Sequence, residues 1–67
     1  MVKLNIIQLL EKEGKSKYWL YNQIGMNHYK NFNNLINNET ISIKFEYIDK
    51  LCDIFNCEIQ DLFIREK

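Results

Sequence analysis

Apolar side chains recur at helical spacing from the start of the chain. In residues 2–13 the leucines and isoleucines fall on one side of a helical projection and the charged residues fall elsewhere, which predicts an amphipathic helix. Gly14 ends this helix. Ser16 is a good N-cap for a second, short helix over residues 17 to 23 or 24, because its hydroxyl can accept a hydrogen bond from the first turn.

The next segment shows the same pattern, in which a glycine ends one helix and a polar residue caps the following helix. Gly25 breaks the chain, and Asn27 or His28 caps a third helix that runs to about Ile36. The polar sequence at residues 37–40 then predicts a turn.

A fourth helix, capped by Ser42, is predicted over roughly residues 43–55, and a last turn or two of helix over residues 58–64. The side chains expected to face inward from these two segments are Phe45, Ile48, Leu51, Cys52, Phe55, Ile59, Leu62 and Phe63. Every segment has the helical period, and no linker or repeat divides the chain. We therefore predict an all-α, compact five-helix bundle that forms a single domain over residues 1–67.

The third predicted helix has an unexpected composition. Five of the eleven residues from 28 to 38 are asparagines, although Asn is a poor helix former. Phe32, Leu35 and Ile36 nevertheless have the i, i+3, i+4 spacing of a helix. Two interpretations stay open: the amides read a partner that offers paired donors and acceptors, or they reflect the codon bias of a chain rich in Asn, Lys, Ile and Tyr.

The length and composition exclude several classes of protein. Sixty-seven residues make one small domain, and 46% hydrophobic residues with nine aromatics are enough for a core. No apolar run reaches membrane-spanning length, and the N-terminus lacks the cleavage site of a signal peptide. We therefore expect a cytoplasmic protein that does not engage a membrane.

The sequence offers little for catalysis or metal binding. Cys52 and Cys57 lie five residues apart and the single histidine is distant, so no four-ligand zinc set is present and free thiols are expected. The chain has no glycine-rich phosphate loop and no nucleophile paired with a base in sequence. We expect no enzymatic activity, no catalytic residues, no metal or other cofactor, and no small-molecule ligand.

The charge is zero overall but unevenly distributed. Residues 1–38 hold five lysines and two glutamates, a net charge of +3, whereas residues 39–67 have a net charge of −3. From residue 14 to residue 38 there is no acidic residue at all, and this stretch contains Lys15, Lys17, His28 and Lys30 among seven asparagines. Such a local basic, amide-rich stretch suits a nucleic-acid partner.

Two segments, SKYWLYNQIGM and NFNNLINNETISIKFEYIDKLCDIFNCEIQDLF, resemble the Cro/CI-like (XRE-type) helix-turn-helix DNA-binding domain, in its short, stand-alone variety. The resemblance covers nearly the whole chain. It rests on the order and spacing of Ser16, Leu20, Gly25 with Met26, Leu35, and the closing LCDIFNCEIQDLF. It implies a lambda-repressor-like fold in which the third helix enters the major groove of double-stranded DNA and the second helix holds the backbone.

The chain departs from that family at two places. Tyr21 stands where the family has a small residue, usually Ala, at the close approach of the second and third helices. The turn after Gly25 also has one additional residue before Phe32, the first buried residue of the third helix. Tyr18, Trp19 and Tyr21 either form a platform on which bases stack or pack the second helix against the first and third.

With Phe32 and Leu35 as anchors, the resemblance implies two sets of DNA contacts. The expected base contacts are His28, Tyr29, Lys30, Asn31 and Asn34. The expected phosphate contacts are Ser16, Lys17, Asn33, Asn37, Asn38 and Lys44.

Assembly and function follow from the same resemblance. Ile59, Phe63 and Ile64 would leave apolar surface uncovered on a monomer, so a homodimer formed through them is expected. The predicted function is a sequence-specific transcriptional regulator, a small repressor that binds a near-palindromic operator as a dimer. The acidic second half and the neutral total charge favour an alternative, an antitoxin- or antirepressor-like protein-interaction module with a weakened DNA face.

Overall fold

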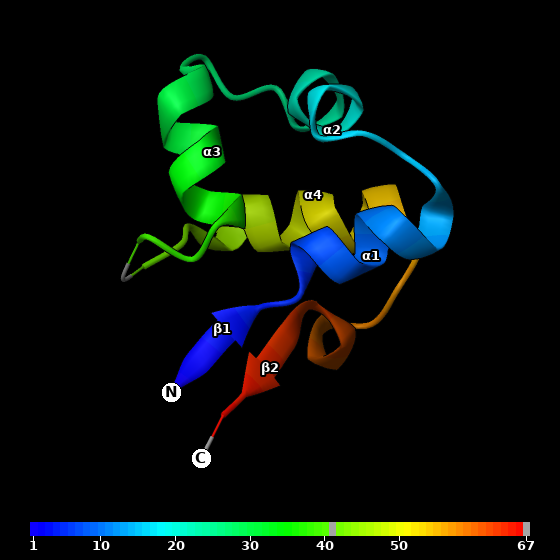
Figure 1. Ribbon diagram of the computed structural model, residues 1–67, viewed down its shortest axis with the longest axis vertical. Coiled ribbons are helices and arrows are strands. Elements are labelled where there is room, and N and C mark those ends of the chain that lie inside the picture. Colours follow the sequence, from blue (N-terminus) through cyan, green and yellow to red (C-terminus); the bar gives the residue numbers. More distant parts are fainter. Residues whose placement is uncertain (41, 67) are drawn as a thin grey trace.

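Figure 1 shows the computed structural model, which describes residues 1–40 and 42–66. The described residues form four α-helices, a short 3-10 helix and a two-stranded antiparallel sheet. The elements in chain order are β1 (Val2–Leu4), α1 (Ile6–Glu13), α2 (Lys17–Ile24), α3 (Tyr29–Ile36), α4 (Phe45–Phe55), η1 (Ile59–Leu62) and β2 (Phe63–Arg65). Helices α2 and α3 lie at one end of the molecule and the sheet, with both termini, lies at the other.

The second and third helices agree with the sequence prediction. Ser16 is the N-cap of α2, and its hydroxyl oxygen accepts a hydrogen bond from the backbone N–H of Trp19 at 3.1 Å. Gly14 and Gly25 end α1 and α2 in the left-handed region, with φ of 68° and 76°, which only glycine adopts without steric cost. These caps confirm where the first two helices end.

The all-α prediction was wrong at both ends of the chain, although η1 provides a turn of helix within the last predicted segment, residues 58–64. Residues 2–4 form β1 rather than the first turn of a helix, and residues 63–65 form β2 rather than the last. The two strands pair in antiparallel register, with Lys3 opposite Ile64. Pairing gives the backbone groups of both chain ends hydrogen-bond partners that the frayed end of a helix would lack.

The start of α4 also differs from the prediction. Lys44, rather than Ser42, is the N-cap, and Phe45, which was expected to face inward, is 87% exposed. A helical side chain covers the turn that precedes its own Cα atom, and Phe45 is the first helical residue, so there is no such turn beneath its ring. Ile59, expected to be buried, is likewise exposed at the start of η1.

The core consists of apolar side chains from all four α-helices, together with one side chain each from β1 and η1. Its members are Leu4, Ile6, Leu10, Leu20, Ile24, Phe32, Leu35, Ile36, Leu51, Phe55 and Leu62. Full burial of one such side chain contributes about 1.5–3 kcal/mol. No helix in the described part of the chain is long and apolar enough to cross a membrane.

The two cysteines lie at the C-terminal end of α4. Asn56 adopts a left-handed conformation with φ of 50°, and the backbone N–H of Cys57 donates to the carbonyl oxygen of Cys52 at 3.1 Å. Both thiols are free and half-buried. Burial raises the pKa of both thiols, and the neighbouring carboxylates of Asp49 and Asp53 raise the pKa of Cys52 further.

We expect these thiols to react slowly. Because the raised pKa lowers the thiolate fraction at pH 8, alkylation by iodoacetamide should be several-fold slower in the folded protein than in concentrated urea. Mass spectrometry of timed samples measures both rates. Equal rates in the two conditions would contradict the shielded environment of Cys52 and Cys57.

Candidate nucleic-acid interface

Helices α2 and α3, with the turn at residues 25–28 between them, form a helix-turn-helix at one end of the molecule (Figure 1). The turn begins at Gly25, whose left-handed backbone changes the chain direction directly after α2. Leu20 and Ile24 are the buried residues of α2, and they pack in the same core as the buried residues of α3. The two helices are therefore fixed to each other by the core as well as by the turn.

The buried side of α3 determines which residues it presents outward. Phe32, Leu35 and Ile36 are 0%, 4% and 1% exposed and define the inner face. Successive residues are about 100° apart on a helix. Lys30 and Asn34 therefore lie on the face opposite the core.

Tyr21 fills the junction between α2 and α3 with an aromatic contact. Its ring centroid lies 5.0 Å from that of Tyr29, in an edge-on arrangement, and 5.4 Å from that of Phe32. Tyr21 is half-buried, so the ring sits at the junction rather than in solvent, as the packing interpretation required. Trp19 is half-buried beneath Lys15, whereas Tyr18 is 65% exposed and contributes little to packing.

The electrostatics of this end follow from the absence of acid in residues 14–38. Lys17, Lys30 and Lys44 are exposed, and the only ion pair in the described part of the chain joins Lys3 to Glu66, at the sheet. The three lysines thus keep their charge available to an external anion.

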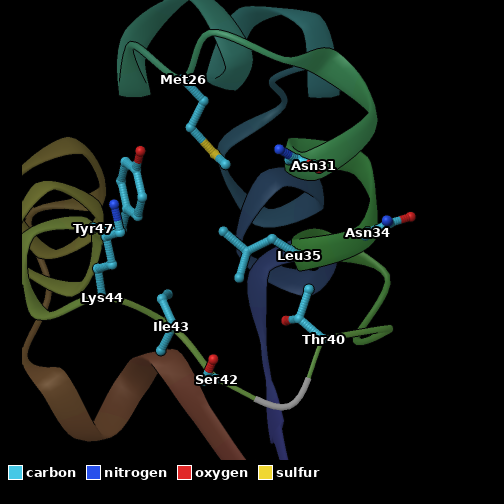
Figure 2. Close-up of a pocket in the computed structure, with 9 residues that line it drawn as sticks. All are labelled: Met26, Asn31, Asn34, Leu35, Thr40, Ser42, Ile43, Lys44 and Tyr47. Atoms are coloured by element: carbon cyan, nitrogen blue, oxygen red, sulfur yellow. The ribbon is translucent and has the colours of Figure 1, made fainter.

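A hollow of about 320 Å³ separates α3 from the start of α4 (Figure 2). Its apolar wall consists of Met26, Leu35, Ile43 and Tyr47, and its polar wall includes Asn31, Thr40, Ser42 and Lys44. Figure 2 shows the amide of Asn31 on the side of the hollow and the amide of Asn34 pointing away from it. Both asparagines line the hollow, but only the amide of Asn31 is directed toward it.

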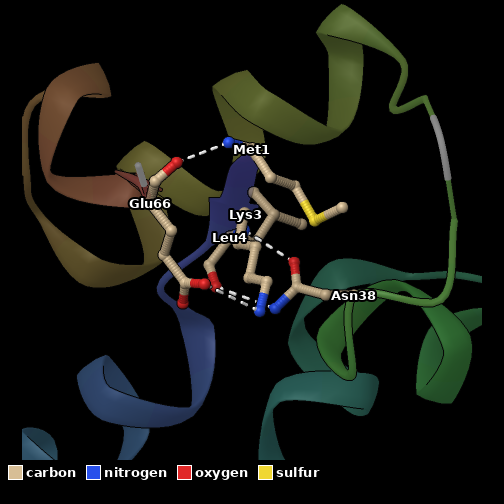
Figure 3. Close-up of polar contacts among 5 residues, drawn as sticks. All are labelled: Met1, Lys3, Leu4, Asn38 and Glu66. Atoms are coloured by element: carbon tan, nitrogen blue, oxygen red, sulfur yellow. Dashed lines mark hydrogen bonds and ion pairs between the residues drawn. The ribbon is translucent and has the colours of Figure 1, made fainter.

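Asn38 ties the end of the third-helix region to the sheet (Figure 3). Its side-chain oxygen accepts the backbone N–H of Leu4 at 2.6 Å, and its side-chain nitrogen donates to the Leu4 carbonyl oxygen at 3.1 Å. The residue has φ of 62°, a left-handed conformation that Asn tolerates better than most residues. The side-chain amide of Asn38 thus binds both backbone groups of Leu4, as the backbone of a neighbouring strand would. The sequence did not indicate this role.

The other residues expected to contact DNA occupy varied environments. His28 is the N-cap of α3 and is exposed, and its side chain makes no capping bond within the described residues. Ser16 is exposed, but its hydroxyl oxygen already accepts the Trp19 N–H. Asn33 is half-buried and Asn37 is exposed at the C-cap of α3.

The three residues expected at a dimer interface lie at the opposite end of the molecule from α2 and the start of α3 (Figure 1). Ile59 and Ile64 are 54% and 38% exposed, and Phe63 is half-buried in β2. The structure thus separates the helix-turn-helix from the apolar surface at the sheet.

Comparison with known proteins identifies the family. The family model of the Cro/C1-type HTH DNA-binding domain matches residues 5–67, so the chain belongs to this family. The match confirms the resemblance drawn from the sequence. Neither the curated proteins nor the solved structures contain a significant match to the chain.

The contact between Asn38 and Leu4 is open to a direct test. Asn38→Gly keeps the left-handed backbone accessible and removes only the amide, so we expect it to lower the free energy of unfolding by about 1–3 kcal/mol. Asn38→Ala should cost about 1 kcal/mol more, because Ala is strained at this φ. Urea denaturation followed by circular dichroism measures both values. The matched control is Asn37→Ala, and equal stability of Asn38→Gly and wild type would refute the role assigned to the amide.

Proposed function

We propose that this Cro/C1-type domain is a sequence-specific regulator of transcription, a small repressor that places α3 in the major groove and acts as a dimer on a near-palindromic operator. The observation that supports this most is the outward, acid-free face of α3, with Lys30 and Asn34 opposite the buried Phe32. B-form DNA admits an α-helix in its major groove, where lysine can contact guanine and asparagine can bind adenine with two hydrogen bonds.

The position of each residue on α3 determines which part of the DNA site it is proposed to contact. Lys30 and Asn34 would read bases from the centre of the outward face, and His28 would do so from its start. Tyr29 is 44% exposed, and its ring, held by Tyr21, would contact a thymine methyl group. Asn31, which faces the hollow, would contact a base at the flank.

The proposed phosphate contacts surround this helix. Lys17 and Lys44 are exposed at the starts of α2 and α4, and Ser16 precedes Lys17. Asn33 and Asn37 would contact phosphates from the sides of α3. We leave Asn38 out of this set, because both functional groups of its amide bind Leu4.

A second function deserves a test because the net charge is zero and residues 39–67 have a net charge of −3. On this alternative the domain binds another protein, in the manner of an antitoxin or antirepressor, and its DNA face is weak. Selection of binding sites from a random duplex library separates the two. A regulator enriches a defined motif, whereas an interaction module enriches none.

Lys17→Ala tests the backbone contacts. Loss of one phosphate contact should weaken binding to all sequences similarly and reduce the slope of log K against log salt concentration by about one unit. Fluorescence anisotropy at several salt concentrations measures the slope. Lys12→Ala, which removes an exposed lysine from α1, should leave the slope unchanged. If Lys17→Ala keeps the wild-type slope, Lys17 is not at the interface.

Asn34→Ala tests base recognition. If the amide reads a base, the substitution should cost roughly 1–3 kcal/mol on the preferred site and little on other sequences. Asn33→Ala is the control, since a phosphate contact lowers affinity without changing the motif. Identical motifs selected by wild type and Asn34→Ala would mean that Asn34 reads nothing and that codon bias explains it.

A further inference from the structure

We infer that the hollow between α3 and the start of α4 is a binding site for a small aromatic carboxylate, and that the bound carboxylate competes with DNA. The site itself does not depend on the proposed function, whereas its effect on DNA rests on it. No small-molecule ligand was expected from the sequence, because the residues that line the hollow come from separate segments and share no motif.

The apolar wall of the hollow is incompletely covered by the fold. Met26, Ile43 and Tyr47 pack against the core but are only half-buried, so each retains apolar surface. Figure 2 shows the thioether of Met26, the ring of Tyr47 and the side chain of Leu35 around the same space. An aromatic ring bound there would contact a sulfur atom and a tyrosine ring, which both attract aromatic groups, and would remove apolar surface from water.

The volume of the hollow limits the size of the ligand. It is about 320 Å³. Ligand pockets span roughly 300–1,000 Å³, so this hollow lies at the small end of the range and suits a molecule of one or two rings.

Lys44 gives the hollow a single positive charge. It is the only charged residue among the nine that line the space, and none of the nine is acidic. Its ammonium group has neither an ion pair nor a hydrogen bond within residues 1–40 and 42–66. An apolar space with one free cation at its edge favours a ligand that carries one negative charge, and a carboxylate accepts a charge-assisted hydrogen bond from an ammonium group.

Uncharged hydrogen-bond donors reach the hollow from both sides. The amide of Asn31 is directed toward it from α3, and the hydroxyl groups of Thr40 and Ser42 line it near the start of α4. None of these three side chains has a hydrogen-bond partner in the described part of the chain. Donors on opposite sides of an apolar space can orient a bound ligand, which a lysine on an open surface cannot do.

A larger hollow elsewhere in the molecule lacks this combination. It has a volume of about 620 Å³ and lies between α1 and η1. Lys12 lines it together with the carboxylates of Glu13, Glu58 and Asp61, so its charge is predominantly negative. Charge therefore favours the hollow beside Lys44 as the site for an anion.

The two ends of the site are also proposed DNA contacts. Lys44 is proposed to contact a phosphate and Asn31 a base at the flank of the DNA site. A carboxylate bound to Lys44 would neutralise the charge that attracts the phosphate, and the ligand would occupy the amide of Asn31. Ligand and DNA should therefore each lower the affinity of the protein for the other by the same factor. Binding of the carboxylate would release the protein from its operator.

Titration of the isotope-labelled protein with indole-3-acetate, without DNA, tests the site. We expect saturable NMR shifts at the Asn31 side-chain amide and at the backbone of Ile43 and Tyr47, with a dissociation constant on the order of 1 mM or below. Indole-3-acetamide has the same shape but no charge, and it should bind on the order of tenfold more weakly. Shifts that do not saturate or that centre on other residues, or equal affinity for the two compounds, would overturn the inference.

Two variants locate the site independently of the NMR shifts. Lys44→Gln should weaken binding of indole-3-acetate on the order of tenfold and leave indole-3-acetamide unaffected. Lys12→Gln, which removes an exposed lysine outside the hollow, is the matched control and should bind both compounds as wild type does. Ser42→Trp places a large ring at an exposed position that lines the hollow and should abolish binding of both compounds. Wild-type affinity for indole-3-acetate in Lys44→Gln or Ser42→Trp would refute the site.

Competition with DNA separates this inference from the proposed function. At a concentration of indole-3-acetate roughly ten times its dissociation constant, the affinity of wild type for its selected DNA site should decrease by about tenfold, and Ser42→Trp should show no such decrease. Unchanged DNA affinity with the hollow occupied would reject the competition. Failure of the protein to bind any DNA, with saturable binding of indole-3-acetate intact, would reject the regulator and retain the carboxylate site.

Discussion

Burial of Phe32 is the constraint on which the candidate interface depends. Its side chain is 0% exposed and contacts the ring of Tyr21 from the neighbouring helix. Once Phe32 and Leu35 face the core, helical geometry leaves no choice about which side of α3 faces outward. The same apolar contacts that stabilise the fold therefore orient Lys30 and Asn34, and the polar residues need no interactions of their own to be correctly placed.

A second structural constraint is the link between α3 and the sheet. Asn38 lies two residues beyond the end of α3 and binds Leu4 in β1, which in turn pairs with β2. A displacement of either end of this path has to break hydrogen bonds or move the other end.

Features that depend on residues close together in the sequence could be predicted from the sequence alone. Ser16, Gly14 and Gly25 determine helix ends through interactions within a few residues, so α2 and α3 were predicted at nearly their observed bounds. The buried Leu20, Phe32 and Leu35 followed from periodicity.

Long-range features could not be predicted in the same way. Three-residue strands carry no periodicity of their own, and residues 2–4 continue the amphipathic pattern of α1. The bonding of Asn38 joins residues 34 positions apart, and its amide is indistinguishable in sequence from those of its neighbours. The contact of Tyr21 with Tyr29 likewise depends on how two helices meet, which the family pattern, with a small residue there, did not suggest.

The pairing of β1 with β2 has a consequence for the order of folding. The bond between Met1 and Glu66 spans 65 positions, whereas each helix closes through bonds four residues apart. Closing so long a loop is entropically costly until the intervening helices have condensed, so the sheet should form last.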